Sequence, residues 1–200
     1  MLTHSARSVP ARPRASRGVS MLEVLIAIGL LTVGLLGVAQ LQFQMQTAEV
    51  EAYQRTQAIV LLQDMVDRIN ANRKSAADYA TGSPLGTAST IDCSAPATLA
   101  QRDQCEWHAA LLGVNETRGG AQLGAMNDAR GCISNPVATM PRQVIVAVAW
   151  QGTSPTAAPG ATACGQGAYG TDDRFRRAMV ASVTIGCLQN DPTSGACVTP

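Results

Sequence analysis

A charge-free apolar run headed by a single carboxylate dominates the start of this sequence. From Val24 to Ala39 no residue carries a charge, and no side chain is more polar than that of Thr32. Glu23 stands directly before the run, inside the segment RGVSMLEVLIAIGLL at residues 17–31. As a helix, Ser20 to Leu41 would extend roughly 30 Å, about the thickness of one hydrocarbon core. The run therefore predicts a helix of membrane-spanning length, and the acidic residue at its head needs an explanation.

Charged residues are distributed unevenly along the chain. The first 18 residues hold four of the 15 basic side chains, Arg7, Arg12, Arg14 and Arg17, and none of the 14 acidic ones. We interpret residues 1–18 as a leader outside the fold, and the positive-inside bias would keep this end in the cytoplasm. The remainder has 11 basic and 14 acidic residues, a net charge of −3. It does not predict nucleic acid as an obligate partner, because phosphate backbones are bound by clustered Lys and Arg.

A second apolar pattern follows the first without a break. Its positions recur in alternating steps of four and three, as on one face of a helix. The stripe comprises Leu41, Met45, Ala48, Ala52, Arg55, Ile59, Leu62, Val66 and Ile69. Since no Pro or Gly interrupts residues 38–81, we predict one helix over about residues 20–74, with an apolar part at 19–41 and an amphipathic half at 42–74. We expect the stripe to pack against the protein's own core, and a coiled-coil or neighbouring-subunit seam is the alternative.

Residues 75–200 are rich in Ala, Ser, Thr, Gly and Pro, which indicates a globular region with many loops. Within it, TLAQRDQCEWHAALLGV at residues 98–114 predicts a short helix. Three large side chains of that helix are available for burial, namely Leu99, Trp107 and Leu111. Residues 115–131 show no periodic pattern and are expected to be irregular.

Two later segments are predicted to be strands. QVIVAVAW, residues 143–150, places Val144, Val146, Val148 and Trp150 on one face. Residues 175–185 alternate Met179, Ala181, Val183 and Ile185 against Val180, Ser182 and Thr184. A long helix packed on a small antiparallel sheet, an α+β fold, is the simplest architecture for these elements.

The cysteines all lie after residue 90. They are Cys93, Cys105, Cys132, Cys164, Cys187 and Cys197. Because no two of them form a C-x-x-C pair, their spacing favours structural disulfides in an oxidising compartment over a zinc ribbon or a thioredoxin-like motif. Six cysteines allow 15 pairings, and only Cys93 with Cys105 is plausible from local spacing. We therefore expect loops supported by disulfides.

The sequence offers little for enzyme chemistry. A Ser-His-Asp arrangement needs a histidine, and the two present are His4, in the leader, and His108, which we expect on the surface or half-buried. GQGAYG at residues 165–170 matches G-x-G-x-x-G but lacks the preceding strand and following helix of a dinucleotide site. We interpret it as a glycine loop, and we predict that the protein is not an enzyme and uses no cofactor.

Two small charged clusters near the end of the loop region remain. Asp172 and Asp173 are too few for the six to eight oxygen ligands that calcium takes, so we expect a solvated loop and no metal. Arg174, Arg176 and Arg177 are the only basic cluster after the leader. We interpret them as a solvated strand end, with an anion or polymer contact as the alternative.

Glu23 would be costly in a membrane without a partner. An acidic group deep in a bilayer costs about 2.5 to 3.5 kcal/mol on insertion scales, and less near the boundary. If the chain were cut after Gly18, the new amine on Val19 would be a cation in the same layer. In a bundle of such helices, the amine of one chain could meet the carboxylate of another.

The segment around that bond resembles the class III signal of type IV pilins and pseudopilins. The resemblance rests on RG before VSMLEVLIA, with Glu as the fifth residue after the cut and an apolar helix continuing onward. It implies that a membrane peptidase cleaves after Gly18 and methylates Val19, and that Glu23 sets the register of each subunit in a filament. Val19 replaces the usual Phe, and Gln40 stands where major pilins often have a helix-breaking Pro.

A second resemblance, to PilV-type minor pilins, narrows the expected function. It is carried by AIVLLQDMVDRINANR at residues 58–73, by QCEWHAALLG and by VAVAW at the end of the predicted strand. It implies a minor pilin that initiates or caps a type IV pilus near its tip and contributes to adhesion, motility or DNA uptake. The implied partners are other minor pilins, the major pilin, the prepilin peptidase, the inner-membrane assembly platform and, before assembly, lipid. The chain would sit in the bacterial inner membrane and then in the extracellular pilus, with residues 75–200 as its periplasmic or extracellular head.

Three alternatives stay open. A minor pseudopilin of type II secretion would share every feature of the N-terminal segment. A secreted or anchored periplasmic binding protein or enzyme would use Gly37-Val38-Ala39 as a conventional signal cleavage site and begin at Gln40. An uncleaved single-pass anchor would retain residues 1–18.

Overall fold

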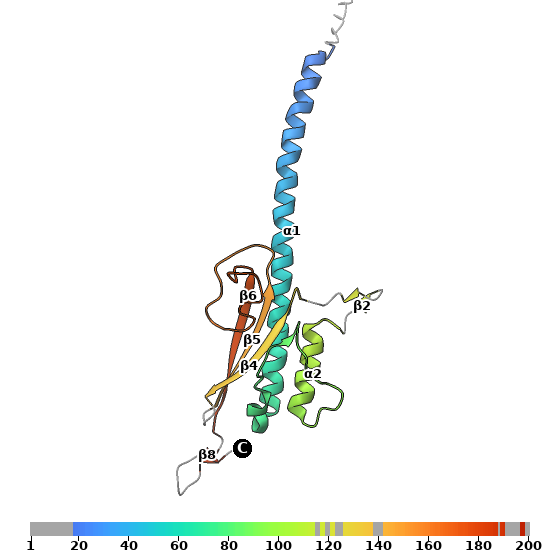
Figure 1. Cartoon of the computed structure of the whole chain (residues 1–200). Coiled ribbons are helices and arrows are strands. Elements are labelled where there is room, and N and C mark those ends of the chain that lie inside the picture. The colour runs from blue at the N-terminus through green and yellow to red at the C-terminus, as the bar shows by residue number, and fades with distance from the viewer. Residues whose placement is uncertain are drawn as a thin grey trace, which may run out of the picture. The chain divides into compact units, whose positions relative to one another are not determined.

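The computed structural model describes residues 18–114, 117–118, 121–122, 126–137, 142–187, 189–190 and 197–198. The chain divides into two compact units, residues 1–45 and residues 46–200. We refer to residues 46–200 as the globular unit. Its elements are shown in Figure 1 and described below together with the helix that begins in the first unit.

The long helix α1 spans Met21–Ala71, close to the predicted 20–74. No Pro or Gly interrupts its second half, so every interior backbone N–H there can find its carbonyl partner four residues earlier. The helix ends three residues earlier than predicted because Asn72 leaves helical geometry, with φ −111° and ψ 48°. A 3₁₀ helix, η1 at Arg73–Tyr79, follows and turns the chain toward the sheet.

The face of α1 that enters the core is displaced from the predicted stripe. Ala58, Leu62, Met65 and Ile69 are buried, whereas Ala52 and Arg55 of the stripe are exposed. Packing against the protein's own core is thus confirmed for the C-terminal part of the helix only. Leu62 and Ile69 of the stripe are buried, but Ala58 and Met65 are buried in place of Ile59 and Val66, which are only partly buried. A sequence repeat shows that a face is apolar, while the partner surface decides which residues of that face are covered.

The main sheet is antiparallel, with four strands in the order β1-β4-β5-β6. These strands are β1 at Leu85–Gly86, β4 at Arg130–Val137, β5 at Arg142–Gln151 and β6 at Arg176–Ile185. The predicted strands at 143–150 and 175–185 are confirmed as β5 and β6, which pair along their full length. Two short ladders complete the described strands: β2 at Thr117–Arg118 with β3 at Ala121–Gln122, and β7 at Gln189–Asn190 with β8 at Cys197–Val198.

Strand β4 was not predicted. The expectation of an irregular segment at 115–131 was wrong at β2 and β3, and at Arg130 and Gly131, where β4 begins. Its sequence RGCISNPV contains Gly, Asn and Pro, which are depleted in strands, and has no apolar alternation. The strand forms because β5 offers a partner ladder, to which residues 130–134 pair in continuous register. A register shift between Ser134 and Val137 accommodates the proline.

The core of the globular unit lies between the sheet, α1 and the helix α2 at Leu99–Leu111. The β5 face predicted to be buried is buried: Val144, Val146 and Val148 are 0% exposed and Trp150 is 4% exposed. Trp107 of α2 is fully buried, and its indole N–H donates to the Leu61 carbonyl on α1 at 2.8 Å. Leu99, expected to be available for burial, is exposed instead, because it is the first residue of α2 and lies next to its Thr98 N-cap.

Disulfides tie the loops to this core. Cys93 is bonded to Cys105 of α2, and Cys132 of β4 is bonded to Cys164 in the β5–β6 loop. Cys187 is also disulfide-bonded. The side chain of Cys197 lies outside those that the structure describes.

The β5–β6 loop is held from inside by Arg176, which corrects the solvated strand end expected there. The guanidinium of Arg176 is 4% exposed and donates to the carbonyls of Thr162 at 2.7 Å and Pro159 at 2.8 Å. It also pairs with Asp173 at 3.3 Å, so Asp173 is buried rather than solvated. Arg174, in contrast, is largely exposed, as expected. The guanidinium of Arg176 is buried because the backbone carbonyls of the surrounding loop need hydrogen-bond donors, which it supplies.

Candidate functional site

The N-terminal start of α1 is fixed by Ser20. Its carbonyl accepts hydrogen bonds from the backbone N–H of Glu23 at 3.0 Å and of Val24 at 3.3 Å. Its hydroxyl oxygen accepts from the Glu23 N–H at 3.2 Å. Ser20 is therefore the N-cap, and Glu23 is the third helical residue, in the Ser-x-x-Glu order typical of a capping box. Gly18 and exposed Val19 lie just before the cap.

Glu23 has a local role that the sequence analysis missed. It lies in the first turn of α1, where the helix dipole favours a negative side chain by about 0.3–1 kcal/mol. The Ser-x-x-Glu signal was present in the sequence and would have revealed it. Within the described residues, no ion pair or side-chain hydrogen bond is formed by the Glu23 carboxylate. None of the residues that the structure describes therefore neutralises this carboxylate.

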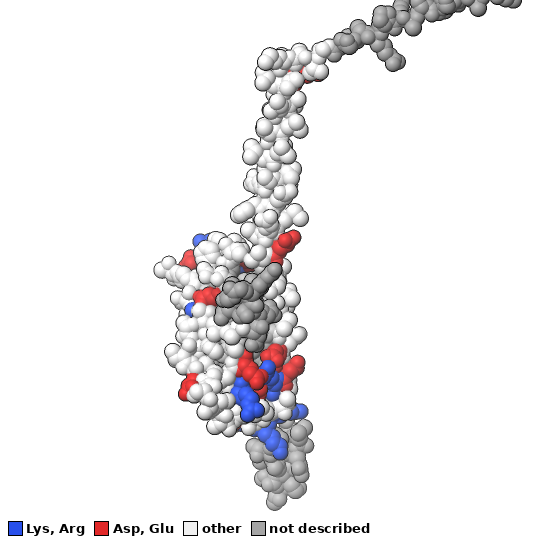
Figure 2. Space-filling model, turned by 90° about the vertical axis from the view of Figure 1, so that its right-hand side faces the viewer, with Lys and Arg blue, Asp and Glu red and all other residues white. Residues whose placement is uncertain are grey.

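The apolar part of α1 is uncovered. Leu22, Leu30 and Leu36 are 67%, 71% and 71% exposed, and Figure 2 shows this part of the helix almost without charged side chains. In the described residues one helix, α1, is long and apolar enough to cross a membrane, and its most apolar window is 0% buried. Each Leu moved out of water contributes about 1.5–3 kcal/mol, so this surface strongly favours lipid or other helices. Cleaved signal sequences can have the same length and apolar composition.

The glycines of this segment contact no other part of the chain that the structure describes. A Cβ added to Gly29, Gly34 or Gly37 would meet nothing within 4 Å. Small residues in apolar helices allow the backbone of a neighbouring helix to approach closely. The Thr32 hydroxyl donates to the Gly29 carbonyl at 2.8 Å, so the one polar side chain of the run is satisfied within the helix.

A charged cluster holds α2 against the second half of α1. The Arg68 guanidinium pairs with Asp64 at 3.0 Å, Asp103 at 3.0 Å and Glu106 at 2.6 Å. Burial alone lowers the pKa of Arg68, but hydrogen bonds to the three carboxylates outweigh it and raise the pKa. The Tyr79 hydroxyl donates to Asp103 from the other side, and burial together with this carboxylate raises the pKa of Tyr79 to about 12. The cluster is structural, because its charges are paired within the chain.

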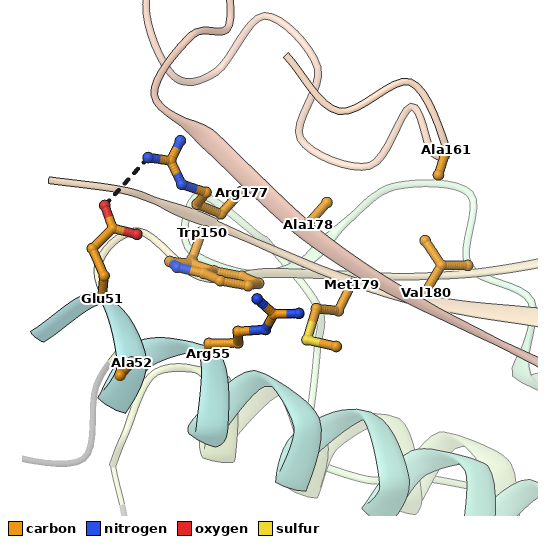
Figure 3. Close-up of a pocket in the computed structure, with 9 residues that line it drawn as sticks. All are labelled: Glu51, Ala52, Arg55, Trp150, Ala161, Arg177, Ala178, Met179 and Val180. Atoms are coloured by element: carbon orange, nitrogen blue, oxygen red, sulfur yellow. Dashed lines mark hydrogen bonds and ion pairs between the residues drawn. The ribbon is translucent and has the colours of Figure 1, made fainter. Parts of the chain in front are cut away.

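A cleft opens between α1 and β6 in the globular unit. It has a volume of about 640 Å³, and its lining residues are Glu51, Ala52, Arg55, Trp150, Ala161, Arg177, Ala178, Met179 and Val180. Figure 3 shows the Trp150 ring between the guanidinium groups of Arg55 and Arg177. Arg177 donates to Glu51 at 3.2 Å and to the Ser154 carbonyl at 2.7 Å, which closes one end of the cleft. Sequence reasoning missed this site, because Arg177 was expected to be solvated.

Among the described residues, neither His108 nor the glycine loop at 165–170 forms a catalytic arrangement, and His4 lies outside the described residues. Nδ1 of His108 accepts the Gly86 N–H at 3.0 Å, and burial lowers the pKa of this half-buried histidine. Residues 165–170 form a loop in which Gly165, Gly167 and Gly170 have positive φ, with no helix after it. Among the described residues, no group of three or more His, Cys, Asp and Glu could hold a metal ion.

The amino-acid sequence matches two protein-family models. Residues 13–39 match the prokaryotic N-terminal methylation motif, and residues 40–108 match the family described as type IV pilin Tt1218. The first match contains the Gly18–Val19 bond, Glu23 and the uncovered apolar helix. The second contains the remainder of α1, then η1, β1 and most of α2. No curated protein and no solved structure matches the chain significantly.

Proposed function

We propose that this chain, a type IV pilin-like protein, is a minor pilin of the type IV pilus. In this proposal a prepilin peptidase removes residues 1–18 by cutting after Gly18 and methylates Val19. Residues 19–41 hold the chain in the inner membrane, N-terminus toward the cytoplasm, and then form part of the filament core. Residues 42–74 continue the helix, and residues 75–200 form the exposed head.

The observation that carries the proposal is the uncovered apolar part of α1, whose one charged side chain, Glu23, has no partner among the described residues. Lipid can cover the apolar side chains before assembly, and sister helices can cover them afterwards. Because both surroundings are apolar, the transfer from membrane to filament keeps the Leu, Ile and Val side chains out of water. Assembly then needs only a small additional gain in free energy.

Pairing of the Glu23 carboxylate supplies this free energy, and the amount depends on how neighbouring subunits are aligned along the filament axis. After cleavage, Val19 carries a positive amine near the same end of the helix. An amine and a carboxylate in an apolar layer attract strongly only when they are close, since opposite charges interact more strongly where water is excluded. Pairing Val19 of one subunit with Glu23 of the next would therefore select one axial register. The chemistry is noncovalent, and no catalysis is involved.

A role near the pilus tip is supported by the resemblance to PilV-type minor pilins. We propose that the protein initiates or caps the filament with other minor pilins, contacts the major pilin and is loaded from the inner-membrane assembly platform. The head contributes to adhesion, motility or DNA uptake. The net charge of −3 on residues 19–200 gives no reason to expect nucleic acid as an obligate ligand.

A minor pseudopilin of type II secretion is the second candidate, favoured by the same N-terminal segment. Co-purification with pilus components and not with secretion components would separate the two. A secreted protein that begins at Gln40 is less compatible with the fold, because Gln40 lies in the interior of α1 and the cut would divide that helix.

The test is incorporation into sheared pili. Glu23→Ala should leave the chain processed and stable in the membrane but largely absent from the pilus fraction, because the register-selecting charge is lost. Glu49→Ala, which removes an exposed acid later in the same helix, is the matched control and should be incorporated normally. Wild-type amounts of the Glu23 variant in sheared pili would contradict the proposed role.

A further inference from the structure

The cleft beside Trp150 has the dimensions of a binding site. Its volume of about 640 Å³ is in the range of roughly 300–1,000 Å³ found for small-ligand pockets. α1 forms one wall, and β5 and β6 form the other. The lining is mostly apolar, with Met179 and Val180 on β6 and Trp150 on β5, so a ligand with apolar groups would be favoured.

The β6 side of the cleft is also a free sheet edge. β6 is the last strand in the sheet order, and no other strand that the structure describes pairs with its outer edge. Residues 178–185, AMVASVTI, contain no charge and no proline, the devices that usually protect such an edge from pairing. Val180 is 37% exposed there. An extended peptide could therefore add to this edge and direct alternate side chains into the cleft.

Two donors in the cleft have no acceptor. The Trp150 indole nitrogen is buried without a hydrogen-bond partner, although the residue is only 4% exposed. Arg55 makes no ion pair or hydrogen bond within the described residues. Arg177, by comparison, is occupied by Glu51, Ser154 and Thr156. A carboxylate is the group that suits both free donors, because it accepts through two oxygens and carries the charge opposite to that of Arg55.

We propose that the cleft binds an extended segment of a partner pilin-type subunit, which pairs with β6 and inserts an acidic side chain between Arg55 and Trp150. The partner's flanking apolar side chains pack on Met179 and Val180. This inference rests on the proposed function, since it takes the partner from the same assembly. It adds a recognition site in the globular unit that is separate from the Glu23 contact.

The test places a photo-crosslinking amino acid at Val180 of the full-length chain in cells that assemble pili, with the same amino acid at exposed Leu99 on α2 as the position control. We expect the Val180 probe, and not the Leu99 probe, to crosslink another pilin-type subunit. Mass spectrometry should locate the crosslink in a segment that contains Asp or Glu. Arg55→Glu should lower the yield by more than about tenfold, because like charges would then face each other. Arg55→Lys should retain most of it.

Further variants separate recognition from folding. Trp150→Phe keeps the ring and removes only the N–H donor, so it should reduce crosslinking several-fold without lowering the unfolding temperature much. Replacing the partner's acidic residue by Lys should restore crosslinking to Arg55→Glu. Crosslinks confined to the chain itself, or a yield unchanged by Arg55→Glu, would overturn the inference.

The amount of the protein in sheared pili, measured in the same cells, distinguishes this inference from the function on which it rests. A chain present in pili without a charge-dependent Val180 crosslink would contradict the cleft alone. A charge-dependent crosslink to a secretion component, with the chain absent from pili, would contradict the pilus assignment and support the cleft.

Discussion

Arg177 of β6 donates to the carboxylate of Glu51 on α1 at 3.2 Å, joining residues 126 positions apart in the sequence. The same carboxylate oxygen accepts the Thr153 backbone N–H at 2.8 Å and the Thr153 hydroxyl at 2.9 Å. Burial raises the pKa of Glu51, but the Thr153 hydrogen bonds and the Arg177 charge outweigh it and leave the pKa below its usual value. The contact connects α1, the β5–β6 loop and the edge strand of the sheet.

Removing the Glu51 carboxylate should lower the free energy of unfolding of the globular unit by an amount that depends on pH. Because the pKa of Glu51 is lowered by folding, its contribution is present above the unfolded value of 4.5 and is lost as the pH falls through the folded value. Glu51→Gln should therefore cost about 1–2 kcal/mol near pH 7 and progressively less below about pH 4.5. Urea unfolding of the wild type and variant checks this, and exposed Glu49→Gln should have little effect at either pH.

Gly131 is required by its close contact with α2. A Cβ at this position would overlap the Trp107 ring and lie 2.7 Å from Cδ1 of Leu111. Gly131→Ala should therefore destabilise the protein by about 1–3 kcal/mol, since the packed core has to shift. Thermal unfolding followed by circular dichroism measures the effect. Gly160→Ala is the control, because a Cβ there would meet nothing within 4 Å, and an equal loss in both variants would contradict the packing argument.

His108 should make stability fall in mildly acidic solution. Its Nδ1 accepts the Gly86 N–H, and burial lowers its pKa below the usual 6.5. The neutral form is therefore favoured by folding, and its contribution is present above about pH 6.5 and is lost as the pH falls through the folded value. The unfolding free energy measured between about pH 7.5 and pH 5.5 should decline in the wild type. His108→Gln, which keeps an acceptor but does not titrate, should show a shallower decline.

The two described disulfides should differ in their contribution. Cys132 and Cys164 are separated by 32 residues, and Cys93 and Cys105 by 12. Closing the longer loop removes more entropy from the unfolded chain, and one native disulfide typically contributes about 2–4 kcal/mol. Replacing Cys132 and Cys164 together by Ser should therefore lower the unfolding temperature more than replacing Cys93 and Cys105. The opposite order would contradict this account.

Local patterns made part of the fold predictable from sequence. The long helix was predicted from a charge-free apolar run followed by a helical repeat without Pro or Gly. Strand β6 was predicted from alternating apolar and polar residues, and β5 from a short run of apolar residues. The strand β4 could not be found in this way, because Gly131, Asn135 and Pro136 contradict strand propensity, and the pairing with β5 on one side and β1 on the other stabilises the strand. The burial of Arg176 depends on which loop carbonyls surround it, and no local pattern records that.

The N-terminal prediction depends on a different kind of signal. Its residues lie close together in the sequence, so the order of Gly18, Val19 and Glu23 could be read directly, and their processing and pairing stay predictions. The capping role of Ser20 was overlooked. The cleft beside Trp150 combines residues from α1, β5 and β6 that are up to 129 positions apart (Glu51 to Val180). No spacing in the sequence indicates that Arg55 and Trp150 line the same cleft.

Cleavage after Gly18, on which filament assembly depends, is tested by the N-terminal peptide of the mature protein. This peptide is determined by mass spectrometry with the prepilin peptidase present and absent. A processed and incorporated pilin should give a peptide that begins at Val19, carries the mass of a methyl group and occurs only when the peptidase is present. A mature chain that begins at Gln40, or one that retains Met1 with the peptidase present, would contradict the filament-assembly account.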